Sequence, residues 1–402
     1  MRGLCAMDKY KYDVSVIGGL GHVGLPLAIA FADKGLRVVA QDINEKAAET
    51  VAAGKLPFLE EGGEEILQRV IGNRLTVSLD PAVVSESKFV VFVIGTPVDE
   101  HLSPSYSLFR DAVTEMLPHI VDDQHVILRS TVFPGTSAKV KEMLGQAGKN
   151  VFLSFCPERI AEGRAIEELH TLPQIVSGFD QQSVDEATGL FRKLTDEIIV
   201  LEPTEAEFAK LMTNTWRYIQ FAAANQFYTL AAQNDLDFYK IHHAVTHRYP
   251  RTQGLPTAGF AAGPCLFKDT MQLATYSNNT FFLGHSSMLV NEGLPNFLIK
   301  ELKKKYPLER YTVGILGMSF KANSDDGRES LSYKLRNLLE LEVNRVLCTD
   351  VYIEDETFVS PTEVIRESDL VIVGAPHDEY RQLDISCELV DIWNFYEKGG
   401  QI

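Results

Sequence analysis

The sequence predicts an α/β fold in which two Rossmann-like, doubly wound parallel-sheet domains are joined by a central helical region. The first observation is an alternation of short β-branched runs with helix-period stretches over residues 13–179. The second is an uninterrupted helical pattern over 204–234, and the third is another β/α series after Arg310. A length of 402 residues corresponds to two to three domains at roughly 150 residues each. We expect the first Rossmann-like domain at 1–203, the helical region at 204–305 and the C-terminal Rossmann-like domain at 306–402.

Composition argues against several classes of partner. The 55 Asp and Glu residues outnumber the 38 Lys and Arg residues, which makes the net charge −17. Such a charge repels nucleic acid and anionic membrane surfaces, so we expect neither as a partner. The longest apolar runs, such as FVVFVI at 89–94, are far shorter than the roughly 20 residues of a membrane helix. Residues 1–13 contain no apolar signal core.

The cysteines are few and widely spaced, without a CxxC pair or a Cys/His cluster. They are Cys5, Cys156, Cys265, Cys348 and Cys387. This pattern predicts neither a disulfide framework nor a metal site. We therefore expect a reduced, cytoplasmic protein.

A glycine-rich turn follows the first β run. The order VSVIGG, GLGHVG, LPLAIAFADKG and LRVVAQD corresponds to strand, turn, helix and second strand. Gly19 is assigned to the tight turn, Gly21 to the approach of a pyrophosphate and Gly24 to close helix packing. Asp42 ends the second strand, where it can bind ribose hydroxyls and disfavour a 2′-phosphate. The cofactor predicted is NAD; the alternative is a tight turn with an incidental helix.

Polar residues end two later strands of the predicted sheet. The four further β-like runs lie at 88–96, 125–131, 150–155 and 173–179. The turns after two of them read Gly95-Thr96-Pro97 and Ser130-Thr131. Ligands of doubly wound sheets bind at these strand ends. The alternative is that Thr96 and Thr131 cap the following helices.

A long helix is predicted from Thr204 to Asn234. Thr204 and Glu207 have the spacing of a capping box. Lys210, Asn214 and Arg217 lie at i, i+4 and i+7, which places them along one face. A solvated face is the usual explanation, but apolar residues crowd the rest of the helix. Much of the helix surface is therefore expected to be buried, and another subunit is one of the elements expected to cover it.

A loop dense in Gly and Pro precedes Cys265, which is followed by Lys268 and Asp269. A cysteine in such a loop beside a cation is typical of a nucleophile. A buried, inert thiol is the alternative, and the local sequence leaves both open.

The C-terminal β/α series lacks the glycine fingerprint. Its first turn reads GMSFKANSDDGRES, which favours a nucleotide or substrate domain over a second NAD site. Lys321 and Arg328 follow its first strand, where they can bind phosphate or remain solvated loop charges.

Read together, the motifs resemble the UDP-glucose/GDP-mannose dehydrogenase family of nucleotide-sugar 6-dehydrogenases. The resemblance runs through VIGGLGHVGLPLA, GTP, STVFPGT, CPERIAEG, EAEFAKLMTNTWR, GPCLFKDT and GMSFKANSDDGRES, in that order. It implies an N-terminal NAD domain, a helical dimer region and a C-terminal domain for the nucleoside diphosphate of the sugar. The implied activity is oxidation of the C6 alcohol of the sugar to a carboxylate. The enzyme is expected to be a cytoplasmic homodimer, and its product is expected to be used in polysaccharide biosynthesis.

The resemblance also assigns residues to roles. Cys265 is implied to capture the aldehyde as a thiohemiacetal, which a second hydride transfer converts to a thioester. The other implied catalytic residues are Lys210, Asn214, Asp269, Glu162 and Thr131. The implied cofactor contacts are Gly19, Gly21, Val23, Gly24, Asp42, Lys46, Thr96, Thr131, Glu162 and Arg328. The implied substrate contacts are Glu158, Arg159, Lys210, Asn214, Arg217, Arg251, Gly259, Gly263 and Lys321, with Arg248 competing with Arg251 for the neighbouring subunit's site.

The sugar is indicated by fewer residues. Glu158 is followed by Arg159-Ile160 rather than the Phe-Leu usual in UDP-glucose members. Together with Arg217, this resembles the branch acting on UDP-N-acetylhexosamines such as UDP-N-acetylmannosamine. Glu162, where that branch often has proline, favours UDP-glucose instead. The base, uracil or guanine, is not indicated.

Two rival functions are less consistent with the motifs. A β-hydroxyacid dehydrogenase of the 6-phosphogluconate type needs neither the cysteine nor a third β/α series. A non-catalytic NAD or nucleotide-sugar binding protein predicts a degraded nucleophile motif, whereas Cys265, Lys268 and Asp269 are all present.

Overall fold

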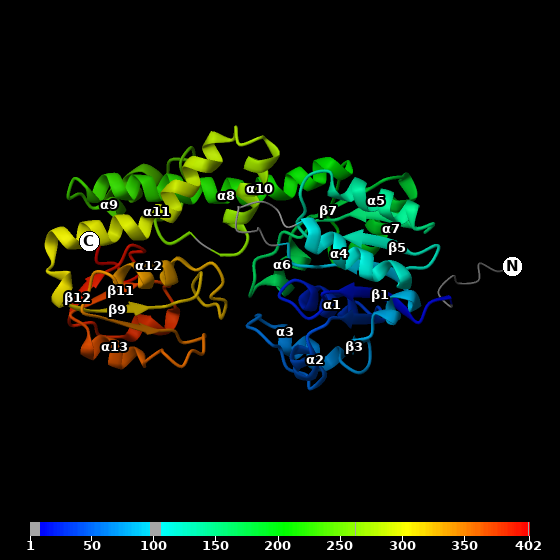
Figure 1. Cartoon of the computed structure of the whole chain (residues 1–402), viewed down its shortest axis with the longest axis horizontal. Coiled ribbons are helices and arrows are strands. Elements are labelled where there is room, and N and C mark those ends of the chain that lie inside the picture. Colours follow the sequence, from blue (N-terminus) through cyan, green and yellow to red (C-terminus); the bar gives the residue numbers. More distant parts are fainter. Residues whose placement is uncertain (1–8, 97–105, 262, 401) are drawn as a thin grey trace. The chain divides into compact units, whose positions relative to one another are not determined.

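A computed structural model describes residues 9–96, 106–261, 263–400 and 402. The chain divides into two compact units, 1–212 and 213–402, and the division falls within one long helix. The three domain ranges expected from the sequence remain a prediction. Each unit contains its own sheet of mainly parallel strands, as predicted (Figure 1).

The first unit is built on an eight-stranded sheet, counted over its described residues. The strand order is β3-β2-β1-β4-β5-β6-β7-β8. The strands are β1 (Tyr12–Ile17), β2 (Val38–Gln41), β3 (Leu75–Ser78), β4 (Ser87–Phe92), β5 (His125–Leu128), β6 (Phe152–Phe155), β7 (Gln174–Gly178) and β8 (Ile198–Val200). The order reverses between β1 and β4, which creates the switch point where doubly wound folds bind ligands.

One pairing departs from the expected parallel sheet. β7 runs antiparallel to β6, with Ser154 opposite Gly178 and Phe155 opposite Ser177. The helix between these strands, α6 (Ala165–Thr171), has seven residues and spans only about 10 Å. This connection does not carry the chain back to the amino end of β6, so β7 starts near the carboxyl end of β6 and runs antiparallel to it. The short strands β3 and β8 were not expected from the sequence.

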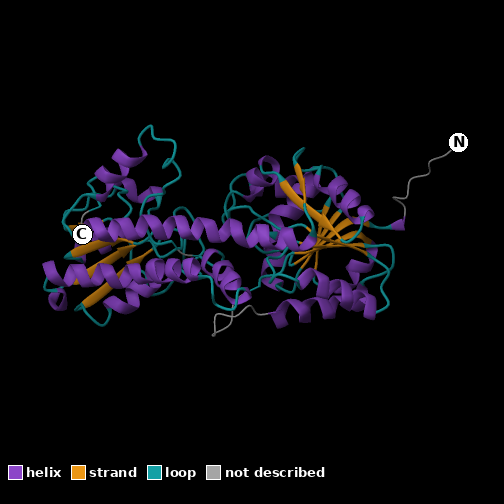
Figure 2. Ribbon diagram, turned by 90° about the horizontal axis from the view of Figure 1, so that it is seen from above, coloured by secondary structure: helices purple, strands orange, loops and turns teal. Residues whose placement is uncertain are grey.

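Helices cover both faces of this sheet (Figure 2). They are α1 (Gly24–Asp33), α2 (Glu45–Ala52), α3 (Gly63–Val70), α4 (Tyr106–Met116), α5 (Thr136–Gln146), α6, α7 (Gln181–Phe191) and the start of α8 (Pro203–Ala232). The core on one face joins α1, α3, α6 and α7 to the sheet, and the core on the other joins α4, α5 and α8. Short 3₁₀ turns lie at η2 (Pro81–Glu86) and η3 (Leu117–His119).

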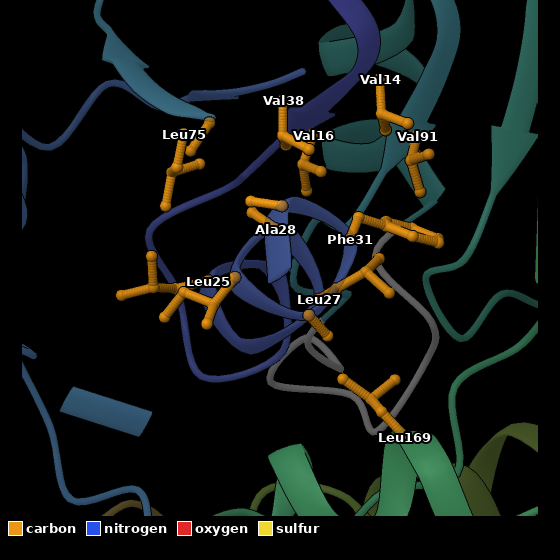
Figure 3. Packing of buried hydrophobic residues seen from close by; sticks show 14 of the residues in the cluster. Val14, Val16, Leu25, Leu27, Ala28, Phe31, Val38, Leu75, Val91 and Leu169 are labelled. Carbon is orange, nitrogen blue, oxygen red and sulfur yellow. The ribbon is translucent and has the colours of Figure 1, made fainter. Parts of the chain in front are cut away.

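Helix α1 is apolar on all sides and is therefore buried. Its Ala28 and Phe31 face the sheet residues Val16, Val38 and Val91 (Figure 3). All of these side chains are almost fully buried. This packing holds the N-terminus of α1 at the carboxyl end of β1.

The predicted long helix is confirmed as α8, but its start differs from the expected capping box. Glu205 reaches back to accept a 2.9 Å hydrogen bond from the Glu202 amide. The buried Glu207 carboxylate instead accepts from the amides of Gly135 and Ser137, at 2.6 and 2.8 Å, and so caps α5. The pairing of Thr204 with Glu207 was wrong because α8 already begins at Pro203 and both Glu207 oxygens accept hydrogen bonds from α5 and its N-cap.

The second unit is built on a smaller parallel sheet with strand order β10-β9-β11-β12. Its strands are β9 (Thr312–Leu316), β10 (Arg345–Thr349), β11 (Leu370–Val373) and β12 (Glu388–Val390). Its helices are the rest of α8, α9 (Phe238–Thr246), α10 (Leu266–Tyr276), α11 (Phe282–Lys305), α12 (Leu331–Leu339) and α13 (Pro361–Glu367), with 3₁₀ turns η4 (Leu308–Arg310) and η5 (Asp378–Gln382). The first three strands follow the runs predicted after Arg310.

One core of the second unit joins α8, α9, α11 and α12 to its sheet, and another contains Val364 of α13. Among the described helices, none combines the length and the apolar character needed to cross a bilayer.

Candidate active site

The glycine turn between β1 and α1 is built by close backbone contacts. Gly18 has φ +73°, and a Cβ there would lie 2.2 Å from the Val93 carbonyl oxygen. A Cβ on Gly24 would lie 2.1 Å from the Gly18 carbonyl oxygen. The left-handed residue of the turn is therefore Gly18, whereas the sequence analysis assigned the turn to Gly19. The Gly-Gly pair in the sequence was the available signal.

Two features of this turn fit a pyrophosphate. A Cβ on Gly21 would have only the Gly18 carbonyl within 4 Å, at 3.8 Å, so the space in front of this exposed residue is open. Val23 is the N-cap of α1 and provides no side-chain cap. No acidic residue lies in the first turn of α1. The helix amides thus point to a site suited to phosphate oxygens.

Asp42 follows β2 and is half-buried. Its Oδ2 accepts a 3.0 Å hydrogen bond from the Leu20 amide, and its Oδ1 accepts from Ile43 at 2.8 Å. Oδ1 also accepts from the Asn44 amide at 3.1 Å, so the further lone pair for a ribose hydroxyl lies on Oδ2. The carboxylate thus connects the glycine turn to the end of β2. Lys46 is exposed in α2, nearby along the chain.

The two threonines predicted at the strand ends lie together. Thr96 Oγ1 donates a 2.5 Å hydrogen bond to the Thr131 carbonyl oxygen. Ser130 Oγ accepts a 2.7 Å hydrogen bond from the Ile94 amide. The turns after β4 and β5 therefore form one rim of the crevice. Pro97, the third residue of the GTP motif, lies outside the described residues.

A buried arginine that the sequence analysis missed lies directly after β5. Arg129 is 1% exposed and forms an ion pair with Glu158. It also donates to Gln174 Oε1 at 2.9 Å and to the Cys156 carbonyl at 3.0 Å, and its guanidinium lies 4.7 Å from the centre of the Phe191 ring. The signal was an arginine directly after the apolar residues 126–128 of the predicted strand.

Glu158 uses both carboxylate oxygens inside the protein. Its second oxygen, Oε1, accepts from the amides of Arg159 at 2.6 Å and Ile160 at 3.0 Å. The half-buried Arg159 donates to the Pro173 carbonyl. This acidic side chain therefore holds the start of the loop that the sequence analysis assigned to substrate.

Glu60 holds the far end of the same loop and was also missed. Its Oε2 accepts from the Gly163 amide at 3.1 Å and its Oε1 from the Ile166 amide at 3.0 Å. Glu168 accepts from the Ala161 amide at 2.6 Å. Glu162 lies between these anchors and is half-buried. The backbone on either side of Glu162 is thus fixed by carboxylates.

The polar row on α8 divides by burial. Lys210 is 8% exposed and Asn214 is 5% exposed, whereas Arg217 is exposed. The expected single polar face therefore consists of two buried residues and one solvent-facing residue.

Asn214 belongs to a buried polar group with Asp269 of α10. Asn214 Nδ2 donates a 2.6 Å hydrogen bond to Asp269 Oδ2. The Lys268 ammonium lies 3.3 Å from Asp269 Oδ1, and the Asp269 side chain is fully buried. The Asp269 amide donates to the Cys265 carbonyl at 2.9 Å. The structure thus brings together three predicted residues, Asn214, Asp269 and Cys265, within the second unit.

Cys265 is the N-cap residue of α10 and is exposed. The other described cysteines differ from it in burial. Burial raises the pKa of Cys156 and of Cys348 to about 12, and it also raises the pKa of Cys387. Of these thiols, Cys265 is the one placed to react with a ligand from solution.

The loop before Cys265 is held by contacts within the second unit. Asn225 exchanges two hydrogen bonds with the Gly259 backbone, at 2.9 and 3.0 Å. A Cβ on Gly259 would lie 2.2 Å from the Trp393 ring, and one on Gly263 would lie 2.5 Å from the Phe320 ring. These two predicted glycines are required by packing. Residue 262 lies outside the described residues.

The remaining predicted residues lie in loops of the second unit. Arg251 is exposed and donates to the Tyr249 hydroxyl at 3.2 Å. Arg328 pairs with Asp326 at 2.6 Å. Lys321 is half-exposed, with its ammonium 5.6 Å from the centre of the Phe320 ring. Among the described residues, no group of three or more His, Cys, Asp or Glu side chains is placed to hold a metal ion.

Comparison with known proteins identifies three consecutive domains of one family. The NAD-binding domain of the UDP-glucose/GDP-mannose dehydrogenase family matches residues 12–195. The central domain of that family matches 204–291, and its UDP-binding domain matches 314–397.

Relatives match along nearly the whole chain. A UDP-N-acetyl-D-mannosamine dehydrogenase of Methanocaldococcus jannaschii is 27% identical over 377 residues, covering 91% of this chain and 86% of that protein. A UDP-D-ManNAc dehydrogenase structure from Pyrococcus horikoshii has a TM-score of 0.88 at 27% identity, covering 95% and 96%. A UDP-glucose dehydrogenase structure from Pyrobaculum islandicum has a TM-score of 0.86 at 25% identity, covering 97% and 96%. The chain therefore belongs to the UDP-glucose/GDP-mannose dehydrogenase family and is an NAD-dependent nucleotide-sugar dehydrogenase.

Proposed function

We propose that this enzyme oxidises the C6 hydroxyl of a UDP-sugar to the carboxylate in two successive oxidations, with Cys265 as the covalent nucleophile. The observation that supports this most strongly is the exposed Cys265 thiol at the start of α10. The partial positive charge of a helix N-terminus favours a thiolate there. Asp269, one turn further along α10, and Asn214 of α8 are joined by a hydrogen bond and provide proton-transfer and hydrogen-bonding groups.

The NAD site is proposed at the glycine turn and the rim of the large sheet. The open space at Gly21, the uncapped α1 N-terminus and Asp42 fit the cofactor. The cofactor contacts proposed are Gly19, Gly21, Val23, Gly24, Asp42, Lys46, Thr96, Thr131, Glu162 and Arg328. Bound NAD accepts one hydride in each oxidation.

The remaining steps are assigned to side chains. Cys265 adds through its sulfur to the aldehyde carbon, forming a thiohemiacetal. Lys210 and Asn214 stabilise its oxyanion. Loss of hydride from this carbon gives a thioester, and water then displaces the sulfur to release the acid and regenerate the thiol. Asp269 and Glu162 are proposed to move the protons, and Thr131 to position the water.

The proposed substrate contacts are Glu158, Arg159, Lys210, Asn214, Arg217, Arg251, Gly259, Gly263 and Lys321. Glu158, with both oxygens engaged by Arg129 and by backbone amides, is proposed to act by holding its loop. Gly259 and Gly263 are proposed to act through the path of their loop, since each packs against an aromatic ring.

We propose a UDP-N-acetylhexosamine, such as UDP-N-acetylmannosamine, as the substrate. Arg159-Ile160 and Arg217 support this, as do the names of the relatives from Methanocaldococcus and Pyrococcus. UDP-glucose is the second candidate, favoured by Glu162 and by the likeness to the Pyrobaculum enzyme.

The test supplies NAD with UDP-N-acetylmannosamine, UDP-N-acetylglucosamine, UDP-N-acetylgalactosamine, UDP-glucose or GDP-mannose. The expected result is two NADH per molecule of UDP-N-acetylmannosamine oxidised. One NADH, with an aldehyde or ketone released, would contradict the thioester route. No oxidation of any sugar would favour a non-catalytic binding protein.

The Cys265→Ser variant tests the nucleophile, with Cys387→Ser as the control. Cys265→Ser should bind NAD and UDP yet release no free acid. Cys387→Ser should turn over like the wild type. If Cys265→Ser produces acid at the wild-type rate, Cys265 is not the covalent nucleophile.

We propose a homodimer formed by the helical region. Exposed apolar residues line α8 at Trp216, Phe227 and Leu230, which lie near one face, and α11 at Phe282 and Leu289. Light scattering should give twice the chain mass, and Phe227→Glu should give the monomer mass. A wild-type monomer would contradict the proposal.

We further propose that the enzyme works in the cytoplasm, where it supplies uronic acids for polysaccharide biosynthesis. The described cysteines are not disulfide-bonded, which is the usual state of cytoplasmic proteins. Cell fractionation with the NADH assay tests the location.

A further inference from the structure

A buried histidine lies behind the loop that bears Lys321. This loop, residues 317–330, follows β9 in the UDP-binding domain. We propose that His377, which follows β11, is a positioning residue that sets the backbone around Lys321 for binding the nucleotide part of the substrate. The proposal rests on the proposed role of Lys321 as a substrate contact.

The two ring nitrogens of His377 have different partners. Nδ1 accepts a 2.9 Å hydrogen bond from the Asn323 amide, two residues after Lys321. Nε2 lies 3.1 Å from Asp350 Oδ2 and 3.2 Å from Ser319 Oγ. A backbone amide is always a donor, so Nδ1 carries no proton and the ring is neutral with its hydrogen on Nε2. The His377 side chain is fully buried.

Asp350 holds the beginning of the same loop. Its Oδ2 accepts from the Met318 amide at 2.7 Å and the Ser319 amide at 3.0 Å. Its Oδ1 accepts from the Tyr352 amide at 2.8 Å. The pKa of Asp350 is lowered, against a rise due to burial, by the hydrogen bond from His377 and by these amides. The carboxylate is therefore ionised and fixes where His377 can place its Nε2 hydrogen.

Hydrogen bonds hold the backbone on both sides of Lys321. Ser319 Oγ donates to the Lys321 carbonyl at 2.7 Å. Asn323 has φ +53°, and its side chain exchanges two hydrogen bonds with Asp378, at 2.7 and 3.0 Å. Asparagine is one of the few residues with a Cβ that adopt this left-handed conformation readily, and its side-chain hydrogen bonds stabilise it here. The bond from the Asn323 amide to His377 fixes the far end of the turn.

Two substitutions separate the two functions of the ring. In His377→Asn, Oδ1 replaces Nδ1 and keeps the acceptor for Asn323. In His377→Gln, the amide NH₂ replaces Nε2 and keeps the donor to Asp350, but the acceptor for Asn323 is lost. Both variants remove similar ring packing against Tyr352 and Tyr380, so each controls for the cavity that the other creates.

The measurement is the affinity for UDP alone by calorimetry, together with the KM for the sugar nucleotide and the KM for NAD. We expect His377→Gln to weaken UDP binding and raise the sugar KM about tenfold, because a lost hydrogen bond of about 1.4 kcal/mol corresponds to that factor. His377→Asn should stay within about threefold, corresponding to about 0.7 kcal/mol. The KM for NAD should stay unchanged in both. Ser319→Ala removes the hydrogen bond to the Lys321 carbonyl and should also weaken UDP binding.

Several results would overturn the proposal. Equal losses in the Asn and Gln variants, or parallel losses of NAD binding, would show a merely structural role. Unchanged UDP affinity in His377→Gln and Ser319→Ala would show that the hydrogen bonds to the Asn323 amide and the Lys321 carbonyl do not affect nucleotide binding. Unchanged UDP affinity in Lys321→Met would remove the contact itself. If the wild type binds UDP but oxidises no sugar, the proposed function fails while the UDP affinities still test the positioning role.

Discussion

The Asn214 amide donates a 2.6 Å hydrogen bond to the Asp269 carboxylate and joins α8 to α10 inside the second unit. Asp269 is fully buried, and Lys268 supplies a cation 3.3 Å from its other oxygen. A buried carboxylate needs hydrogen-bond donors or a cation as partners, and Asn214 and Lys268 supply them here. The position of the carboxylate that the proposed mechanism uses near Cys265 therefore depends on Asn214.

The first prediction replaces Asn214 with aspartate. Asn214→Asp changes the donor into an acceptor and brings two carboxylates to hydrogen-bonding distance. We expect a loss of about 1–3 kcal/mol in the free energy of unfolding from the broken hydrogen bond, together with slower turnover. Urea unfolding and initial-rate kinetics measure these two effects. The control is Gln226→Glu on the exposed face of α8, expected within about 0.5 kcal/mol of wild type. Equal stability of the two variants would contradict the buried bond.

The second prediction concerns the ion pair between Arg129 and Glu158. Arg129→Met leaves a buried carboxylate without its cation, and we expect a loss of about 3–5 kcal/mol. Adding Glu158→Gln should restore part of that loss, since the glutamine oxygen can still accept from the Arg159 amide. Chemical denaturation of the single and double variants gives the coupling energy.

The matched control for this pair is Arg164→Met. Arg164 pairs with Glu167 at 2.7 Å, but both side chains are more than half exposed. A surface pair contributes about 0–1 kcal/mol. If Arg129→Met and Arg164→Met lower the free energy of unfolding by similar amounts, the buried ion pair contributes no more to stability than the exposed one.

The third prediction concerns thiol reactivity. Iodoacetamide should modify Cys265 in the folded protein at neutral pH, while Cys156 and Cys348 should react only after unfolding. Burial raises the pKa of both thiols from 9.0 to about 12. Between those pH values the folded state keeps protons that the unfolded state releases, so the free energy of unfolding falls as the pH rises from about 9 to 12.

Peptide mass spectrometry locates the label, and Cys265→Ser should abolish the fast reaction. Rapid modification of Cys156 in the folded protein at neutral pH would contradict the burial found for it.

The fourth prediction compares adjacent glutamates. Glu60→Ala removes the acceptor for the Gly163 and Ile166 amides, and we expect a loss of about 1–3 kcal/mol and faster hydrogen exchange over 161–166. The exposed neighbour provides the control, since Glu61→Ala leaves its backbone bond to Gly163 in place. An effect of Glu61→Ala as large as that of Glu60→Ala would show that these side-chain bonds are not what holds the loop.

Much of the fold was predictable because it depends on local patterns. The strand, glycine turn, helix and second strand that lead to Asp42, the helix α8 and the loop before Cys265 each follow from patterns within one continuous stretch of sequence. The family could be identified because several such motifs occur in order. The same motifs also contain the side chains proposed for the site, such as Asp42 and Cys265, so these could be named from the sequence.

The partners of individual side chains were decided by the tertiary structure. Glu207 caps α5 instead of its own helix, and Arg129, after β5, pairs with Glu158, after the neighbouring strand β6. The Asn323 amide meets His377, 54 residues away in the chain. A sequence pattern specifies that a carboxylate or an imidazole is present, but a buried polar group bonds to whatever donor or acceptor packing brings within about 3 Å. Packing between distant segments therefore determined which acids hold the backbone and of which segment.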